Sequence, residues 1–260
     1  MLSTFTLDER RMLEENYRLT YSTSTSNLST PLSQLMNDEN LKMYLSAVKD
    51  RTKAANLGVA ASLFVKRYSF AVLIALYSMS VLNKKINFSI NNISIQTFDE
   101  SDILWLPYIK FDCLDFCLSD KIDDRVTWRN KFLTEIFADH IEVIFNNFGR
   151  ISKLSKRIMW ENLYTYIVWM YRNVLTDENY VHQHHTIKED FNWLTSVRDG
   201  SIFSEYNENP FLKFRGSKDI NSILEGDPHK RITCCLSYLT ESKGAFCNGC
   251  PIARKRNQKE

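Results

Sequence analysis

Apolar residues recur every three or four positions along most of the chain, which is the spacing of one face of an α-helix. The repeat is clearest between Ile151 and Val174. The helical region over residues 52–82 is expected to be broken or bent near Gly58. Together these positions predict helices over residues 1–20, 31–36, 38–50, 52–82, 126–148 and 151–175, and one more before Asn209.

The period changes between residues 84 and 97. Apolar and polar residues alternate over residues 86–90 and again over 93–97, the pattern of β-strands with one buried face. Asn91-Asn92 lies between the two runs, and Asn tolerates the positive φ that a two-residue hairpin turn requires. The segment therefore predicts a β-hairpin.

A further extended segment is expected over residues 103–113, at a sheet edge or strand end because Pro107 cannot donate a ladder hydrogen bond. After Gly216 no regular pattern remains. The sequence thus predicts a mostly helical α+β protein with a small β-hairpin or sheet. It divides into a helical body, residues 1–215, and an irregular C-terminal segment, residues 216–260.

The composition is that of a folded protein, because 44% hydrophobic and 13% aromatic residues supply a sizeable core. The net charge of +2 lacks the basic excess of nucleic-acid-binding domains, so no nucleic-acid partner is expected. The N-terminus lacks the positively charged start and following apolar run of a signal peptide. The apolar run over residues 70–82 is shorter than the roughly 20 residues of a membrane span. We expect a buried core helix there, no integral membrane segment and a cytoplasmic location.

Four of the six cysteines lie within seventeen residues near the C-terminus, as the adjacent pair Cys234-Cys235 and the motif Cys247-x2-Cys250. A disulfide staple, a zinc site and an iron–sulfur cluster are the three interpretations. In a reducing cytosol disulfides are disfavoured, and clustered cysteines more often bind metal.

Geometry bears on the choice between the two metals. A C-x2-C loop can bring two thiolates together, and Gly249 lowers the steric cost of that turn. Structural zinc sites usually space paired cysteines about 2–4 residues apart, so the adjacent pair suits one tetrahedral ion poorly. The two irons of a binuclear cluster relax this demand. The spacing favours an iron–sulfur cluster, and zinc stays open.

The motifs R-x-T-C-C-L-x-Y (Arg231 to Tyr238) and G-A-F-C-N-G-C-P (Gly244 to Pro251) resemble the tail signature of the FhuF-type ferric-siderophore reductase family. The stretches AASLFVKRYSFAVLIALYSMSVL and SKLSKRIMWENLYTYI, and NPF before the cysteines, resemble the rest of that family. The resemblance implies a cytosolic [2Fe–2S] protein whose cluster ligands are Cys234, Cys235, Cys247 and Cys250. Eleven residues separate the second and third of these cysteines, one more than in the family pattern.

The implied activity is reduction of siderophore-bound Fe(III) to Fe(II), one electron at a time, which releases the iron after uptake. No nucleotide-binding fingerprint is present, so an external electron donor such as a ferredoxin or flavodoxin is expected. Transient contact with an uptake transporter is compatible with this role. The alternative is a binding or structural protein stabilised by a four-cysteine zinc site, without redox activity.

An anionic chelate favours a basic surface, and the helical body is the expected siderophore-binding side. Each such side chain also has the plain interpretation of a solvated surface charge. The candidate substrate contacts are Arg231, Lys66, Arg67, Lys156 and Arg157, with Lys153 and Lys230 as weaker additions and Trp160 as a stacking face.

Three other features have mainly structural interpretations. His182, His184 and His185 are expected to form an exposed loop cluster. Cys113 and Cys117 are four residues apart and could meet on one helical face, and buried free thiols are the expected case. The basic tail ARKRNQKE could dock an acidic electron donor, or it could be a frayed terminus.

Overall fold

The structure is a computed structural model of the whole chain. It describes residues 5–114, 124–204, 206–226, 229–240 and 246–253, and in addition the backbone of residues 2–3 and 116–117. The fold is mostly helical with a small antiparallel sheet, which confirms the predicted class.

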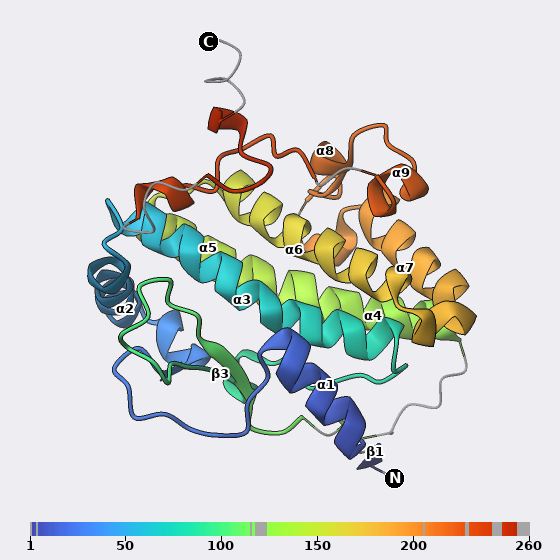
Figure 1. Cartoon of the computed structure of the whole chain (residues 1–260), viewed down its shortest axis with the longest axis horizontal. Coiled ribbons are helices and arrows are strands. Elements are labelled where there is room, and N and C mark those ends of the chain that lie inside the picture. The colour runs from blue at the N-terminus through green and yellow to red at the C-terminus, as the bar shows by residue number, and fades with distance from the viewer. Residues whose placement is uncertain are drawn as a thin grey trace.

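Helix α3 (Leu57–Ser80) runs through the middle of the molecule (Figure 1). By length and composition it could cross a membrane, but 83% of its most apolar window is buried inside the protein. It is therefore the core helix that the sequence predicts. Other helices pack around it: α1 (Leu7–Tyr17), α2 (Asp38–Thr52), α4 (Arg125–Ile136), α5 (Glu142–Ser152), α6 (Lys156–Thr176) and α7 (His184–Ser196).

The helix boundaries follow local capping. Lys53 takes a left-handed conformation at the end of α2. The Asn56 side chain then accepts a hydrogen bond from the Val59 amide, and α3 begins. The chain therefore breaks between α2 and α3, just before Gly58, where the sequence predicts a break or bend. Lys153, also left-handed, separates α5 from α6. The other helical segments are short. They are η1 (Leu32–Met36), η2 (Ile90–Asn92), the π-helical turn η3 (Phe137–Ile141), η4 (Glu178–Gln183), η5 (Ser201–Phe203), α8 (Leu212–Arg215), α9 (Ile220–Leu224) and η6 (Ser237–Leu239).

The sheet has the strand order β2 (Thr30–Pro31), β3 (Ile93–Gln96), β4 (Tyr108–Phe111), all antiparallel. Strand β3 is central, with Ile95 opposite Thr30 on one side and opposite Ile109 on the other. Strand β4 begins immediately after Pro107, as expected for a proline at a strand end. A separate two-stranded pair joins β1 (Leu2–Ser3) to β5 (Phe116–Cys117).

The predicted hairpin is wrong, although its second arm is β3. Ile90–Asn92 form a 3₁₀ turn, and the first arm is not a strand. Ile86 and Phe88 are buried in the core without strand pairing, so their alternation reflects burial alone. The Asn92 side chain donates to the carbonyls of Asn87 and Cys113 at 2.8 and 2.9 Å, and this ties the turn to the end of β4.

Two other expectations need correction. Cys113 is exposed and Phe116–Cys117 is a strand, so the two cysteines do not share a helical face. The side chain of Cys117 lies outside the described residues. The histidine cluster spans the end of η4 and the start of α7 and is not a loop; His182 and His185 are exposed and His184 is half-buried.

A buried ion cluster fixes α4 against α7. Asp190 is fully buried; Arg125 donates to both of its carboxylate oxygens at 2.8 Å, and the buried Arg129 donates to one of them at 3.2 Å. A carboxylate in such a place is tolerated only while it is paired. Arg129 also pairs with the exposed Glu189 at 3.2 Å.

Removing that carboxylate should strongly destabilise the fold. We expect Asp190→Ala to lower the free energy of unfolding in urea by about 3–5 kcal/mol, because it removes the buried carboxylate shared by Arg125 and Arg129 and leaves Arg129 with the exposed Glu189, 3.2 Å away. Asp38→Asn is the matched control, since Asp38 pairs with Arg150 at an exposed site and should change stability little. Equal effects of the two substitutions would contradict this account.

Candidate metal centre

The cysteine-bearing segments, residues 229–240 and 246–253, lie across the ends of α3 and α6 (Figure 1). They contain little regular structure, so their position depends on individual contacts with the helices. The backbone amide of Ala55, just before α3, donates to the carbonyl of Leu239 at 3.0 Å. Within the segments, the amide of Arg231 donates to the carbonyl of Gly249 at 3.1 Å, which joins the two cysteine motifs.

The strongest anchor is the carboxylate of Glu161 on α6, which is fully buried. It accepts from the backbone amides of Ile232 and Thr233, both at 2.6 Å, from the Thr233 hydroxyl, and from His229 Nε2 at 3.1 Å. Burial raises the pKa of this carboxyl, but the hydrogen bonds from His229, Thr233 and Ile232 prevail and lower it to about 2. Glu161 is therefore ionised and holds the backbone immediately before Cys234.

A second set of polar contacts reaches Cys235. The buried Arg231 donates to Asn162 Oδ1 at 2.7 Å and to Thr165 Oγ1 at 3.2 Å. Asn162 donates to Ser62 Oγ on α3 at 2.9 Å, and Ser62 donates to the carbonyl of Cys235 at 2.7 Å. The contacts on α6 and α3 thus fix the backbone on both sides of Cys234.

The sulfurs of Cys235 and Cys247 are 3.6 Å apart. Two thiolates bound at about 2.3 Å to one tetrahedral metal are roughly 3.8 Å apart, so this pair fits one zinc or one iron. The amide of Cys250 donates to the carbonyl of Cys247 at 2.9 Å, which closes the tight C-x2-C turn. A Cβ at Gly249 would lie 2.4 Å from the carbonyl of His229, so only glycine fits there.

The distance between the Cys235 and Cys247 sulfurs suits two ligands of one metal ion, but the described residues do not bring four ligands together. Among the described residues, no group of three or more histidine, cysteine or acidic side chains is gathered closely enough to hold a metal ion. Cys234 and Cys250 belong to the same two motifs, and residues 241–245, which connect those motifs, lie outside the described part of the chain. Cys234, Cys235, Cys247 and Cys250 form no disulfide with one another.

Cys235 is the sulfur best prepared to be a thiolate, the form that binds metal. The hydrogen bond with Cys247 lowers its pKa, against burial, and the ammonium of Lys66 lowers it further. Lys66 Nζ lies 4.0 Å from Cys235 Sγ and 2.7 Å from Ser237 Oγ. The same sulfur–sulfur contact and burial raise the pKa of Cys247.

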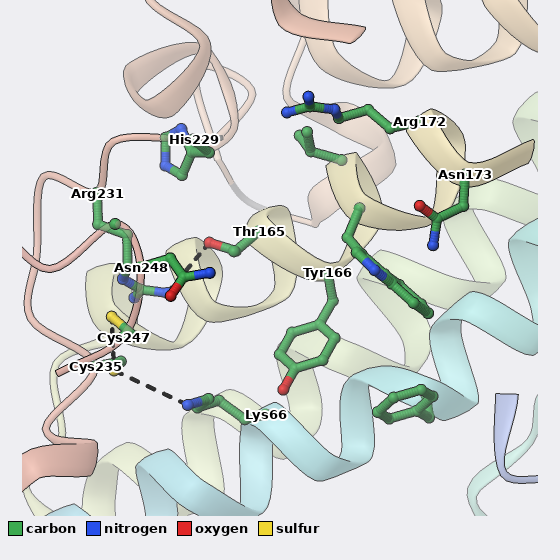
Figure 2. A pocket seen from close by; sticks show the side chains of 14 residues that line it. Lys66, Thr165, Tyr166, Arg172, Asn173, His229, Arg231, Cys235, Cys247 and Asn248 are labelled. Carbon is green, nitrogen blue, oxygen red and sulfur yellow. Dashed lines mark hydrogen bonds between the residues drawn. The ribbon is translucent and has the colours of Figure 1, made fainter. Parts of the chain in front are cut away.

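The cysteine pair opens into a pocket of about 510 Å³ (Figure 2). Its walls come from α3, from two turns of α6 and from the segment that bears the cysteines. A smaller hollow of about 270 Å³ lies between Cys247, Arg67 and Leu104. Cys247 and Lys66 border both cavities.

Of the predicted substrate contacts, Lys66 and Arg231 line the larger pocket and Arg67 lines the smaller one. Arg67 donates to the carbonyls of Leu104 and Trp105. Arg231 is 4% exposed and most of its donors are occupied, so its role is to hold the cysteine segment.

The remaining candidates line neither of the two cavities. Trp160 is buried and donates to Tyr206 at 2.9 Å, so it offers no stacking face. Lys156 pairs with Glu142, and Arg157 is exposed outside both cavities. Lys153 and Lys230 are exposed as well. Residues 254–260 of the basic tail lie outside the described part of the chain.

Sequence reasoning missed Glu161, Asn162 and Ser62, which position the cysteines, and Trp169 and Arg172, which line the pocket. One signal was available: Glu161-Asn162 interrupts the apolar face of a helix that is otherwise buried. A charged residue on such a face needs a partner, but the sequence does not identify that partner.

Comparison of the chain with models of known protein families finds no match, and comparison with curated proteins finds none either. The site is therefore interpreted from its own residues and geometry.

Glu161→Gln should loosen the cysteine segment while the helical body stays folded. An amide side chain cannot accept from all the donors that surround this carboxylate, and each lost charge-assisted bond costs about 1.5–3 kcal/mol. We expect hydrogen exchange at the Ile232 and Thr233 amides to accelerate about tenfold or more, with unchanged helical circular dichroism. Glu142→Gln is the control, a buried carboxylate on α5 that contacts Lys156 and Tyr206 instead. Unchanged exchange in Glu161→Gln would contradict the anchor.

The same carboxylate predicts an acid-sensitive contribution to stability. Its pKa is about 2 in the folded protein against 4.5 for an ordinary glutamate. The ionised form thus contributes about 3 kcal/mol at pH values above 4.5, and this is lost as the pH falls from 4.5 towards 2. The difference in unfolding free energy between wild type and Glu161→Gln should shrink over that range. A difference that does not change with pH would show that ionisation of Glu161 is unimportant.

Proposed function

We propose that the chain holds a [2Fe–2S] cluster through Cys234, Cys235, Cys247 and Cys250 and reduces ferric siderophores by one electron. The observation that carries the proposal is the position of the Cys235–Cys247 sulfur pair, 3.6 Å apart and directly at a ligand-sized pocket. The resemblance of the tail motif to FhuF-type reductases supports the same reading.

A [2Fe–2S] cluster supplies one electron at a time and has a low reduction potential when all four ligands are thiolates, around −400 mV in plant-type ferredoxins. The residues of the chain provide what such a cluster needs. Glu161, Asn162 and Ser62 fix the ligand backbone. Lys66 places a positive charge beside Cys235, which favours the thiolate.

The electron balance is simple. One electron passes to the Fe(III) of a chelate held in the pocket, which becomes Fe(II), and no bond to carbon forms or breaks. Fe(II) is less charged and binds hard oxygen donors more weakly, so the iron is released. A reduced ferredoxin- or flavodoxin-type protein would restore the electron. A cytoplasmic location, with transient contact to an uptake transporter, fits this role and belongs to the proposal.

Protein purified without oxygen should be red-brown and contain iron and sulfide in equal amounts. Cys235→Ser should lose most of the iron, because it removes a thiolate from the pair and leaves Lys66 without its sulfur partner. Cys113→Ser, which changes an exposed thiol outside the site, should retain it. Colourless protein with zinc as its metal would contradict the proposal and favour the structural zinc site, whose thiolate spacing is the same.

The reductase step has its own test. Protein bleached with dithionite and freed of excess reductant should regain its colour when an Fe(III) siderophore is added. An iron–sulfur protein that stays reduced in the presence of every ferric siderophore would be an electron carrier or sensor with another partner.

A further inference from the structure

We propose that the pocket beside Cys235 and Cys247 binds the ferric chelate itself and selects chelates that carry a net negative charge and flat aromatic donor groups. Arg172 is the counter-ion, and Tyr166 and Trp169 are the stacking faces. The identity of the ligand as a substrate rests on the proposed function, whereas its binding can be tested alone.

The charged residues that line the pocket are basic. Lys66, Arg172 and Arg231 line it, and no aspartate or glutamate does so among the described residues. Arg231 faces Glu161, 3.7 Å away, which balances its charge. Arg172 donates to the carbonyl of Gly226 at 2.6 Å and has no carboxylate partner in the described part of the chain. Lys66 and Arg172 therefore leave positive charge for an anionic ligand.

The two cations are well separated. Lys66 lies beside the sulfurs, and Arg172 lies on the far side of Thr165 and Tyr166 (Figure 2). Thr165 and Arg172 are seven residues apart on α6, which is about 10 Å along the helix axis. A chelate that spans this length would place its metal near the sulfurs and an anionic arm at Arg172. The volume of about 510 Å³ lies within the range of roughly 300–1,000 Å³ that is usual for small-molecule sites.

An aromatic wall runs between the two cations. Phe70, Tyr166 and Trp169 line the pocket together, and Phe70 packs edge-on against the other two rings at centroid distances of 5.5 and 6.2 Å. Trp169 is 41% exposed although it is a large apolar residue on a mostly buried helix. Rings held in place by their neighbours and open to a cavity are suited to stack on planar groups.

These features separate the siderophore classes, which the sequence alone does not. A ferric tris-catecholate is anionic and presents three aromatic rings. A ferric trihydroxamate core has no net charge and no rings, and a ferric citrate-type chelate is anionic without rings. The pocket should prefer them in that order: catecholate first, the ring-free anion second and the neutral chelate last.

Gallium(III) chelates test binding without electron transfer, because Ga(III) matches Fe(III) in charge and size but is not reduced. Titration calorimetry with the whole protein should find the Ga(III) tris-catecholate bound at least about tenfold more tightly than the trihydroxamate. Arg172→Gln should remove most of this preference. Arg157→Gln, an exposed arginine on the same helix outside the pocket, should leave it unchanged. Trp169→Leu should weaken the catecholate and leave the ring-free anion unaffected.

The outcomes separate this inference from the proposed function. Equal affinity for the anionic and neutral gallium chelates, or an Arg172→Gln protein that keeps the preference, would overturn the inference even in a red-brown protein. The expected preference in a protein that contains only zinc would uphold the pocket and reject the redox role. Tight binding of the ring-free anion at the level of the catecholate would overturn the assignment of the stacking faces.

Discussion

The contact on which the cysteine site depends is the buried ion–dipole cluster at Glu161. An ionised carboxylate inside a protein is unfavourable unless its lone pairs are filled, and here the donors come from the segment that carries the cysteines. Glu161 on α6 therefore depends on donors from the cysteine segment, and the segment depends on α6 for its position. Because the segment has almost no regular structure of its own, this mutual dependence determines where Cys234 and Cys235 lie.

The packing of α3 against α6 extends the constraint to the pocket. Ser62 on α3 and Asn162 on α6 are hydrogen-bonded to each other and, directly or through Arg231, to the cysteine segment. Farther along the same two helices, Lys66, Phe70 and Arg172 line the cavity. The interface that positions the sulfurs is thus continuous with the interface that lines the pocket.

The sequence predicts the helical part of the fold well, because the long apolar repeats of α3 and α6 depend on local spacing. It fails where a pattern has two causes. Ile86 and Phe88 alternate with polar residues because they are buried in an extended segment, and this pattern is the same as that of a paired strand. The cysteines stand out as candidate ligands, but Glu161 meets Ile232 across 71 residues, and no local pattern reports such a distance. Arg231 looks like a substrate contact for the same reason: its buried partners are invisible in the sequence.

Our proposal is that the sulfur pair at the pocket belongs to a one-electron centre that acts on a chelated ferric ion. Its most direct test is a single-turnover reaction without oxygen, in which reduced protein is mixed with one equivalent of a ferric siderophore in the presence of an Fe(II) trap. We expect the protein to be oxidised at the rate at which trapped Fe(II) appears, with one electron lost for each Fe(II) formed. Oxidation of the protein without Fe(II), or Fe(II) formed while the protein stays reduced, would contradict it.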